Sequence, residues 1–349
     1  MHAQPPVAGA PGVLIADLHA DSLLWPRRLL DHGTRGHVDV PRLIEAGVGL
    51  QVFGLVTRVP LIPDLHSNDG ATDAIALLAP ASRWPRATWT SPLERALFQA
   101  GRLNALVSSS GGRVYPVLSR ADLETLIARR AAGERVVGAV LAVEGAHAIE
   151  GRLQNVDRLF EAGVRMMSPS HFFDTRVGGS AHGARKHGLT RLGREVIARM
   201  ETIGMAVDLA HASPATIREI AAMTTRPLVA SHTGVRGTCD HIRNLDDEAV
   251  HAIADSGGVI GIGYWETAIC GRDIASIVRA IRYVADRVGH RHVALGSDFD
   301  GAVTVPFDTT GVPQLHAALL ADGFSREQAA DIMGRNAVRV LHETLPPGR

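Results

Sequence analysis

The sequence contains very little cysteine. Cysteine occurs only twice in 349 residues, at positions 239 and 270, and neither residue belongs to a CxxC pair. Two cysteines are too few for the disulfide framework that stabilises small secreted domains. We therefore expect both thiols to be reduced and the protein to be cytoplasmic.

The chain also lacks a net charge and a long hydrophobic segment. Lys plus Arg and Asp plus Glu both total 36, so no overall positive field attracts nucleic acid or an anionic lipid surface. No apolar run approaches the roughly 18 residues of a membrane helix. The first residues show no basic segment followed by an apolar one, as a signal peptide would. We expect neither a nucleic-acid partner nor a membrane partner.

Short apolar runs, many of them rich in β-branched residues, are what the sequence does contain. Such runs are typical of strands that are buried on both faces of a parallel sheet. There are eight of them, at residues 13–18, 48–56, 136–143, 165–170, 205–210, 228–231, 258–264 and 293–296.

Helical patterns separate these runs, for example at residues 122–132, 193–203 and 274–288. Eight alternating strands and helices predict a (β/α)8 barrel of the TIM type. A doubly wound sheet is the weaker alternative, because no glycine-rich phosphate loop follows the first run. We predict a flexible N-terminus, 1–12, and a single domain, 13–345. Two outer helices at 313–341 are expected, with Ser325 and Gln328 forming a capping box at the second.

Five segments end an apolar run with a residue that can bind a metal ion or transfer a proton. Because the carboxyl ends of parallel barrel strands meet at one rim, these side chains should lie together. Imidazole nitrogen and carboxylate oxygen are ligands that Zn²⁺ prefers. The set supplies enough donors for two divalent cations, which indicates a hydrolase with a binuclear site. Its members are His19, Asp21, Glu144, His211, His232 and Asp298.

Each of these residues also has a simpler interpretation. His19 and Asp21 alone could be a packed histidine beside a helix-capping aspartate. Glu144 could pair with an arginine inside the barrel mouth, since buried charges are usually paired. His211 and His232 could be ordinary histidines of the rim. The coincidence of so many strand ends favours metal binding.

The same segments carry recognisable motifs. Together these motifs resemble those of the membrane dipeptidase (renal dipeptidase) family of zinc peptidases. They cover roughly residues 13–341 and occur in the same order as in that family. The motifs are Asp-Leu-His-Ala-Asp at 17–21, Val-Glu-Gly-Ala-His at 143–147, Gly-Met-Ala-Val-Asp-Leu-Ala-His at 204–211, Ser-His at 231–232, Arg-Asn-Leu-Asp-Asp at 243–247 and Gly-Ser-Asp-Phe-Asp-Gly at 296–301.

The resemblance implies a barrel that holds two zinc ions per chain at the C-terminal face of its strands. By position, His19 and Asp21 would bind one zinc ion, and His211 and His232 the other. Glu144 would bridge the two ions. The family's members are commonly homodimers, so the resemblance also implies a homodimer.

The resemblance further implies roles for three residues around the metal ions. His171 would polarise the scissile carbonyl and stabilise the tetrahedral intermediate. Arg243 would bind the terminal carboxylate of the substrate, for which a planar guanidinium is suited. Its alternative is an ordinary salt bridge with Asp246 or Asp247. Asp298 would be the acid–base group facing the bridging water, although from the residues alone it is equally a metal ligand.

One segment departs from the family's pattern. The family's familiar members carry an Asn-rich loop after the histidine at position 171, whereas this chain has a loop rich in glycine with the aromatic pair Phe172 and Phe173. These residues and Arg176 could change the preference for substrate side chains. The stretch 60–114 is longer than a simple crossover, and we expect a helix within it near 92–107.

The leading hypothesis is a zinc dipeptidase that attacks dipeptides through a metal-bridging hydroxide. A second hypothesis is an amidohydrolase with the same site, acting on N-acyl amino acids or another small amide or lactone. Arg243 separates the two in part, since it predicts a substrate with a free carboxylate. A non-catalytic metal-binding barrel is the third possibility, and the presence of His171 and Asp298 beside the ligands argues against it.

Overall fold

Nine parallel strands form one sheet in the computed structural model, which describes residues 13–348. Every residue of eight of these strands is buried, as the apolar runs predicted, and β3 is the exception. The predicted flexible segment, 1–12, lies outside the described residues. The strands are β1 (Ile15–Ala20), β2 (Val48–Val56), β3 (Val114–Pro116), β4 (Val137–Glu144), β5 (Val164–Met167), β6 (Ala206–Val207), β7 (Val229–Thr233), β8 (Val259–Ile262) and β9 (Val293–Leu295).

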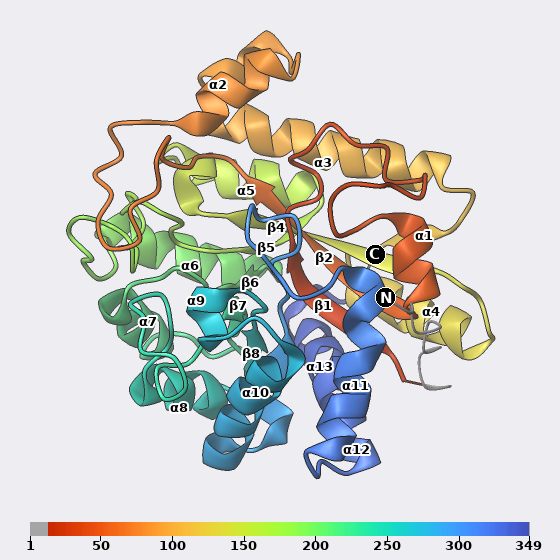
Figure 1. Cartoon of the computed structure of the whole chain (residues 1–349). Coiled ribbons are helices and arrows are strands. Elements are labelled where there is room, and N and C mark those ends of the chain that lie inside the picture. Colours follow the sequence, from red (N-terminus) through yellow and green to blue (C-terminus); the bar gives the residue numbers. More distant parts are fainter. Residues whose placement is uncertain (1–12, 349) are drawn as a thin grey trace.

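The sheet curls into a barrel (Figure 1). Its strands follow the order β6-β5-β4-β2-β1-β9-β8-β7, so β6 and β7 are its two ends. A parallel bridge joins Asp208 to Val229 there, and the Leu209 amide donates to the Val229 carbonyl at 2.6 Å. These contacts close the barrel, and the predicted (β/α)8 architecture is confirmed.

One strand was not predicted. Strand β3 pairs with β4 at Val137–Ala139, whereas β5 pairs with β4 from Leu141 onward. Because β2 occupies the other edge of β4, β3 and β5 must share this edge. The run that forms β3 was missed because it has only three residues and ends at a proline.

Helices surround the barrel, and most begin at a Ser, Thr or Asp whose side chain accepts a hydrogen bond from the first turn. The predicted capping box of Ser325 and Gln328 is confirmed. No helix within residues 13–348 is long and apolar enough to cross a membrane. The helices are α1 (Val40–Glu45), α2 (Ala74–Ala81), α3 (Pro92–Ser109), α4 (Arg120–Ala131), α5 (Gln154–Glu161), α6 (Arg191–Ile203), α7 (Pro214–Ala221), α8 (Asp247–Asp255), α9 (Glu266–Ile269), α10 (Ile274–Val288), α11 (Val312–Ala321), α12 (Arg326–Ala330) and α13 (Asn336–Thr344).

The barrel strands pack apolar side chains on both faces. Residues two apart on a strand point the same way, and accordingly Leu50 and Val52 of β2 belong to one buried cluster while Phe53 and Leu55 belong to another. The first cluster also contains residues of α13, and the second lies largely between the strands and the outer helices. Because both faces are buried, the register of each strand is fixed. The register in turn sets the level along the barrel axis at which the last residue of the strand lies.

The expectation that both cysteines are reduced is wrong. Cys239 and Cys270 form a disulfide with a Cα–Cα distance of 5.2 Å. Cys239 lies in the loop after β7 and Cys270 directly after α9, in the loop that follows β8. Because β7 and β8 are neighbours in the barrel, their loops meet, although 31 positions separate the two residues in sequence.

We predict that the disulfide stabilises the fold. Replacing both residues, in Cys239→Ser/Cys270→Ser, should lower the free energy of unfolding by roughly 2–4 kcal/mol, because a cross-link over a loop of this length restricts the unfolded chain. Urea titration would measure the loss, and the unmodified protein in reductant should approach the variant. Two reactive thiols in unreduced, denatured protein would contradict the pairing.

Candidate metal centre and active site

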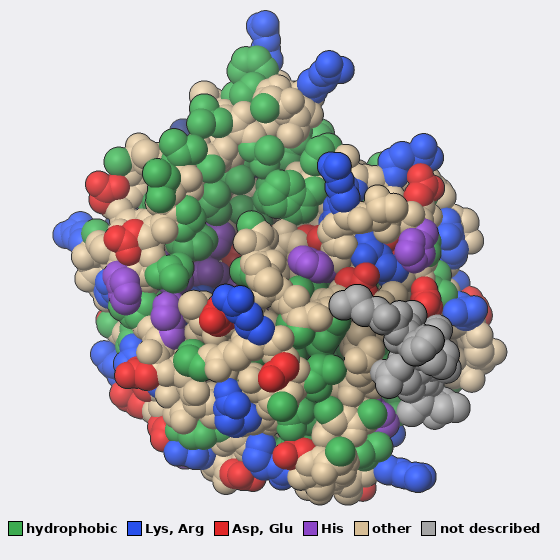
Figure 2. All heavy atoms as spheres, in the orientation of Figure 1, with side chains coloured by type: hydrophobic (Ala, Val, Ile, Leu, Met, Phe, Trp, Pro, Cys, Tyr) green, Lys and Arg blue, Asp and Glu red, His purple; other side chains and the backbone are tan. Residues whose placement is uncertain are grey.

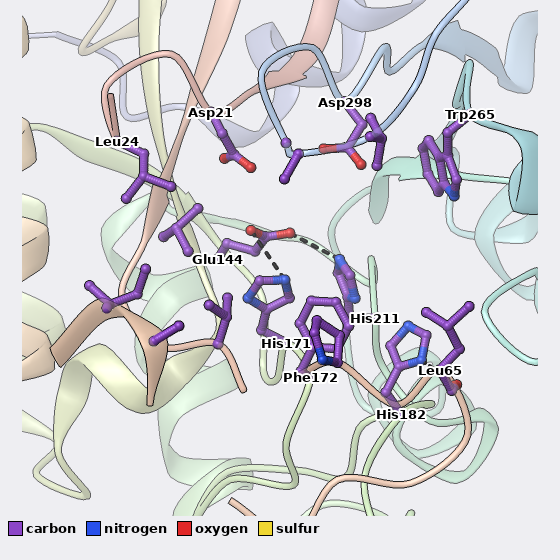
Figure 3. A pocket seen from close by; sticks show the side chains of 18 of the residues that line it. Asp21, Leu24, Leu65, Glu144, His171, Phe172, His182, His211, Trp265 and Asp298 are labelled. Carbon is purple, nitrogen blue, oxygen red and sulfur yellow. Dashed lines mark hydrogen bonds and ion pairs between the residues drawn. The ribbon is translucent and has the colours of Figure 1, made fainter. Parts of the chain in front are cut away.

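The predicted ligands converge at the carboxyl ends of the strands. His19 and Asp21 come at the end of β1, Glu144 is the last residue of β4, and His232 lies within β7. His211 follows β6, and the segment after β9 adds Asp298. All six side chains are buried. Figure 3 shows four of them, Asp21, Glu144, His211 and Asp298, facing one another in the barrel mouth.

Glu144 is at the centre of this cluster. Its Oε1 lies 2.9 Å from His211 Nε2, 3.3 Å from His232 Nε2 and 3.8 Å from His19 Nε2. Its Oε2 lies 3.5 Å from His171 Nε2. Within residues 13–348, no arginine forms an ion pair with Glu144, so the alternative of a simple salt bridge is wrong.

The carboxylates and His19 of the cluster are buried together, and this shifts their pKa values. Burial, reinforced by the charge of Asp21, raises the pKa of Glu144 well above its usual range. Burial likewise raises the pKa of Asp298 to about 8. For His19, burial lowers the pKa, but Asp21 and Glu144 outweigh it and raise the pKa to about 10. The site therefore favours positive charge at its centre.

Two of the histidines are electrostatically different from His19. Burial lowers the pKa of His211 and of His232 well below the ordinary value, and the charge of Arg243 lowers both further. Both imidazoles are therefore neutral at neutral pH, which is the form that binds metal ions. Their Nε2 atoms lie 3.0 Å apart and face each other.

The side chains present fit divalent cations. In the described part of the chain, several buried polar atoms of the cluster have no hydrogen-bond partner, among them both ring nitrogens of His19, Oδ1 of Asp21 and Oε2 of Glu144. Buried polar atoms are normally paired, so such a gathering fits side chains that bind cations. There are three groups of residues whose donor atoms lie within 4.8 Å of one another inside the group, and Glu144 belongs to two of them, as a bridging carboxylate would. The groups are His19–Glu144–His232, Glu144–His171–His211 and His19–Asp21–Asp298.

Two aspartates below the rim hold these side chains in place. Asp208 accepts from the Ser231 amide at 2.9 Å and from its hydroxyl at 2.6 Å, and the same hydroxyl lies 2.9 Å from His232 Nδ1. Asp17 binds the amide and hydroxyl of Ser297 in the same way, at 2.8 and 2.7 Å. Both aspartates occur in the sequence motifs, but sequence reasoning gave them no role. Such outer contacts fix the orientation of metal ligands.

The backbone at the rim is shaped for this cluster. His211 and Asp298 adopt left-handed φ values of 63° and 57°, which non-glycine residues rarely do and which concentrate at functional sites. On β2, Gly54 leaves the space that His19 and Asp21 need, because a Cβ there would lie 2.3 Å from Asp21 Oδ1. The arrangement of these two side chains therefore depends on a glycine in the neighbouring strand.

Arg243 lies beside the cluster and is 5% exposed. Its Nη2 donates to the His232 carbonyl at 2.7 Å and its Nη1 contacts the Thr233 hydroxyl at 3.2 Å, while its Nε has no partner. The alternative of a salt bridge is wrong, because Asp246 caps α8 and Asp247 binds Tyr283 and Arg287. No residue among 13–348 forms an ion pair with Arg243. Burial lowers its pKa to about 10, so it remains a cation at neutral pH.

A cavity of about 690 Å³ opens over these residues. His171, Phe172 and His182 line it from the loop after β5. The Phe172 ring lies 4.6 Å from the His171 ring and 5.1 Å from the His182 ring. His182 was missed by sequence reasoning, because no strand end marks its position. Its Nδ1 lies 2.7 Å from the Leu65 carbonyl, which ties this loop to the segment after β2.

Comparison with known proteins agrees with the geometry. The model of the membrane dipeptidase family, peptidase family M19, matches residues 11–345. An uncharacterised Klebsiella pneumoniae protein from the pqqA 5′ region is 34% identical over 266 residues, 72% of this chain and 96% of that protein. Dipeptidase aclJ of Aspergillus oryzae is 33% identical over 215 residues, 59% of this chain and 51% of aclJ, about half its length.

A solved structure shows the same fold with a bound ligand. It is a metallopeptidase from Rhodobacter sphaeroides, liganded with a phosphinate mimic of the dipeptide L-Ala-D-Ala. The TM-score is 0.78 at 26% identity, over 95% of this chain and 99% of that one. With the family model matching nearly all of the sequence, the chain belongs to the membrane dipeptidase family, peptidase family M19.

Proposed function

We propose that this protein is a zinc dipeptidase that hydrolyses the peptide bond of dipeptides with a free C-terminal carboxylate. The observation that carries the proposal is Arg243, a buried cation without a carboxylate partner among the described residues, at the edge of the cavity that contains the Glu144 cluster. A buried, unpaired guanidinium is costly, and a substrate carboxylate would compensate it.

Two zinc ions fit the donors of the cluster. His19 and Asp21 would hold one ion and His211 and His232 the other, with Glu144 between them. Nitrogen and carboxylate ligands in this number are typical of zinc. Bound cations of this kind lower the pKa of a shared water and polarise a carbonyl oxygen.

The chain's own residues then position the substrate and move protons. Arg243 binds the carboxylate, which places the scissile carbonyl over the cluster. His171, whose pKa burial lowers well below the usual value, is a neutral imidazole whose N–H can stabilise the oxyanion. Asp298 takes the proton of the attacking water and returns it to the leaving amine. Burial raises the pKa of Asp298, and cations bound beside it would lower that pKa again, so that the ionised carboxylate could accept the proton.

Hydrolysis of N-acyl amino acids is a second candidate. It needs the same carboxylate contact but no contact with a substrate ammonium, and the apolar side of the cavity favours it. Lactones and amides without a carboxylate would leave Arg243 uncompensated. A purely structural metal site would not need Arg243 at all.

The homodimer and the single domain over 13–345 stay predictions. A cytoplasmic location also stays a prediction, and the Cys239–Cys270 disulfide weighs against it, because disulfides persist mainly in oxidising compartments.

Glu144→Gln should lose bound zinc together with activity, because an amide cannot offer a negatively charged oxygen to each of two ions. Zinc content of the purified variant, measured by atomic absorption, is the test. Glu161→Gln, an exposed change on the outer helix α5, should retain the full metal content. Two tightly bound zinc ions in Glu144→Gln would refute the bridging role.

Arg243→Met should weaken dipeptides with a free C-terminus. Loss of one partner of a desolvated charge pair costs roughly 2–5 kcal/mol, or about 30-fold to several thousandfold in kcat/KM. The deficit should nearly vanish on C-terminally amidated dipeptides, where wild type already lacks the contact. Arg191→Met, at an exposed surface site, is the control. Equal losses on free and amidated substrates would rule out carboxylate recognition.

Asp298→Asn should reduce kcat by at least about 100-fold, since general acid–base catalysis is worth roughly 10²–10⁴-fold. Substrate affinity and zinc content should stay close to wild type, because the amide keeps the size of the side chain but cannot accept the proton. Turnover and zinc are measured on one preparation. A variant that loses one zinc ion would show that Asp298 is a ligand.

A further inference from the structure

One side of the cavity is built from apolar side chains. Six of them, here called the α2 wall, come from the loop after β1, the end of β2, the loop after β2 and helix α2. They line the cavity and also belong to, or pack against, a single buried cluster. The α2 wall consists of Leu24, Trp25, Val56, Val59, Ile75 and Leu78.

The α2 wall is held rigidly. Asp73 caps helix α2, and its carboxylate accepts from Arg95 Nη1 at 2.6 Å. The fully buried Arg95 also donates to the Thr57 carbonyl at 2.8 Å. The Trp25 indole donates its N–H to the Asp300 carbonyl at 2.7 Å. The polar atom of Trp25 is therefore satisfied. A wall fixed in this way is preformed for a ligand, which lowers the entropic cost of binding.

The α2 wall offers no partner for a positive charge. Among the described residues that line the cavity, the carboxylates are Asp21, Glu144 and Asp298, and all three belong to the metal cluster. A substrate ammonium directed toward α2 would lose its hydration without gaining an ion pair, which is costly. An apolar group in the same place would be stabilised by burial.

The apolar surface continues to the outside of the cavity. Of the seven exposed large hydrophobic side chains among residues 13–348, four lie in the segment 61–77. They include Ile62 at 84% and Leu77 at 60% exposure, and Leu77 also lines the cavity. In Figure 2, hydrophobic side chains gather around the hollow below α2, and histidines are visible inside it. Contiguous apolar surface of this kind marks a binding site.

The position of Arg243 gives the substrate a direction. Arg243 lies against Trp265, with its Cζ 5.9 Å from the ring. Leu24 and Asp21 lie on the opposite side of Glu144 from Trp265 (Figure 3). A carboxylate bound to Arg243 and a carbonyl over Glu144 therefore direct the acyl side of the substrate toward the α2 wall.

From this arrangement, and resting on the proposed hydrolysis of carboxylate-bearing amides, we infer that the preferred substrates carry a large apolar group on the acyl side of the scissile bond. The group is either an apolar N-terminal side chain of a dipeptide or the chain of an N-acyl amino acid. Both sources present the same chemistry to the α2 wall, and substrates of the two kinds distinguish them.

The test compares two substrate series on the zinc-loaded protein, each ending in L- or D-alanine. One series is Gly-, Ala-, Leu- and Phe-alanine, and the other is acetyl-, hexanoyl- and decanoyl-alanine. Within at least one series, kcat/KM should rise by up to about fourfold for each buried methylene. From glycine to leucine, or from acetyl to hexanoyl, four carbons are added, so the rise should lie between about 30-fold and about 250-fold. The series that rises identifies the source of the apolar group.

Variants of cavity residues test whether the apolar side of the cavity causes the rise in kcat/KM. In Leu78→Gln and in Leu77→Gln, the ratio of kcat/KM between the largest and the smallest substrates should fall by at least about fivefold, while the smallest substrates keep their rates. Ile127→Gln changes a 39% exposed residue of α4, outside the cavity, and should leave both series unchanged. Leu78→Met should restore the rise, because methionine keeps the apolar volume.

Binding is measured as well, so that a failure of hydrolysis does not hide the result. The ligands are 4-oxo acids in which a methylene replaces the scissile nitrogen, with short or long apolar chains, and the readout is the calorimetric Kd. Tighter binding of long chains to wild type than to Leu78→Gln supports the inference even if nothing is hydrolysed, an outcome that would refute only the proposed function. Flat rates and flat Kd values across both series would overturn the inference.

Discussion

Glu144 is 4% exposed at the end of a strand that is otherwise apolar, and its charge must be compensated inside the barrel. The compensation does not come from an arginine. Four imidazoles approach its two oxygens from different strands and loops, at 2.9 to 3.8 Å, and among them only His19 has a raised pKa and can carry a positive charge. An ionised Glu144 is stable there only if positive charge is bound nearby. The other features of the site follow from this requirement.

The position of the ligands depends on how the barrel closes. Asp17 binds Ser297 and thus joins β1 to the segment after β9, and Asp208 binds Ser231 and thus joins the segment after β6 to β7. The second pair lies at the seam, where the bridge between Asp208 and Val229 completes the sheet. The hydroxyl of Ser231 also contacts His232. The contacts that close the barrel therefore also orient the His232 side chain.

The cavity has a charged floor and an apolar side. Its floor consists of buried charged and imidazole groups on the barrel rim. Its α2 side is apolar and comes largely from the segment between β2 and α3, which exceeds a simple crossover in length. A polar floor can cleave the bond and bind the carboxylate, while an apolar side can distinguish among acyl groups. The division lets the loops set specificity while the rim retains its chemistry.

The amino-acid sequence by itself determined the strands, the outer helices and the residues that end at the rim. Double burial makes each strand a continuous apolar run, and a charged residue at the end of such a run, as at Glu144 or Asp298, is recognisable without a structure. The three-residue β3 was too short for such a pattern. Only the tertiary structure decided which loops meet. It paired Cys239 with Cys270, left Arg243 without Asp246 or Asp247, and brought α2 beside the cluster. These outcomes depend on which strands are neighbours in a closed barrel, and contacts between distant loops leave no periodic pattern in the sequence.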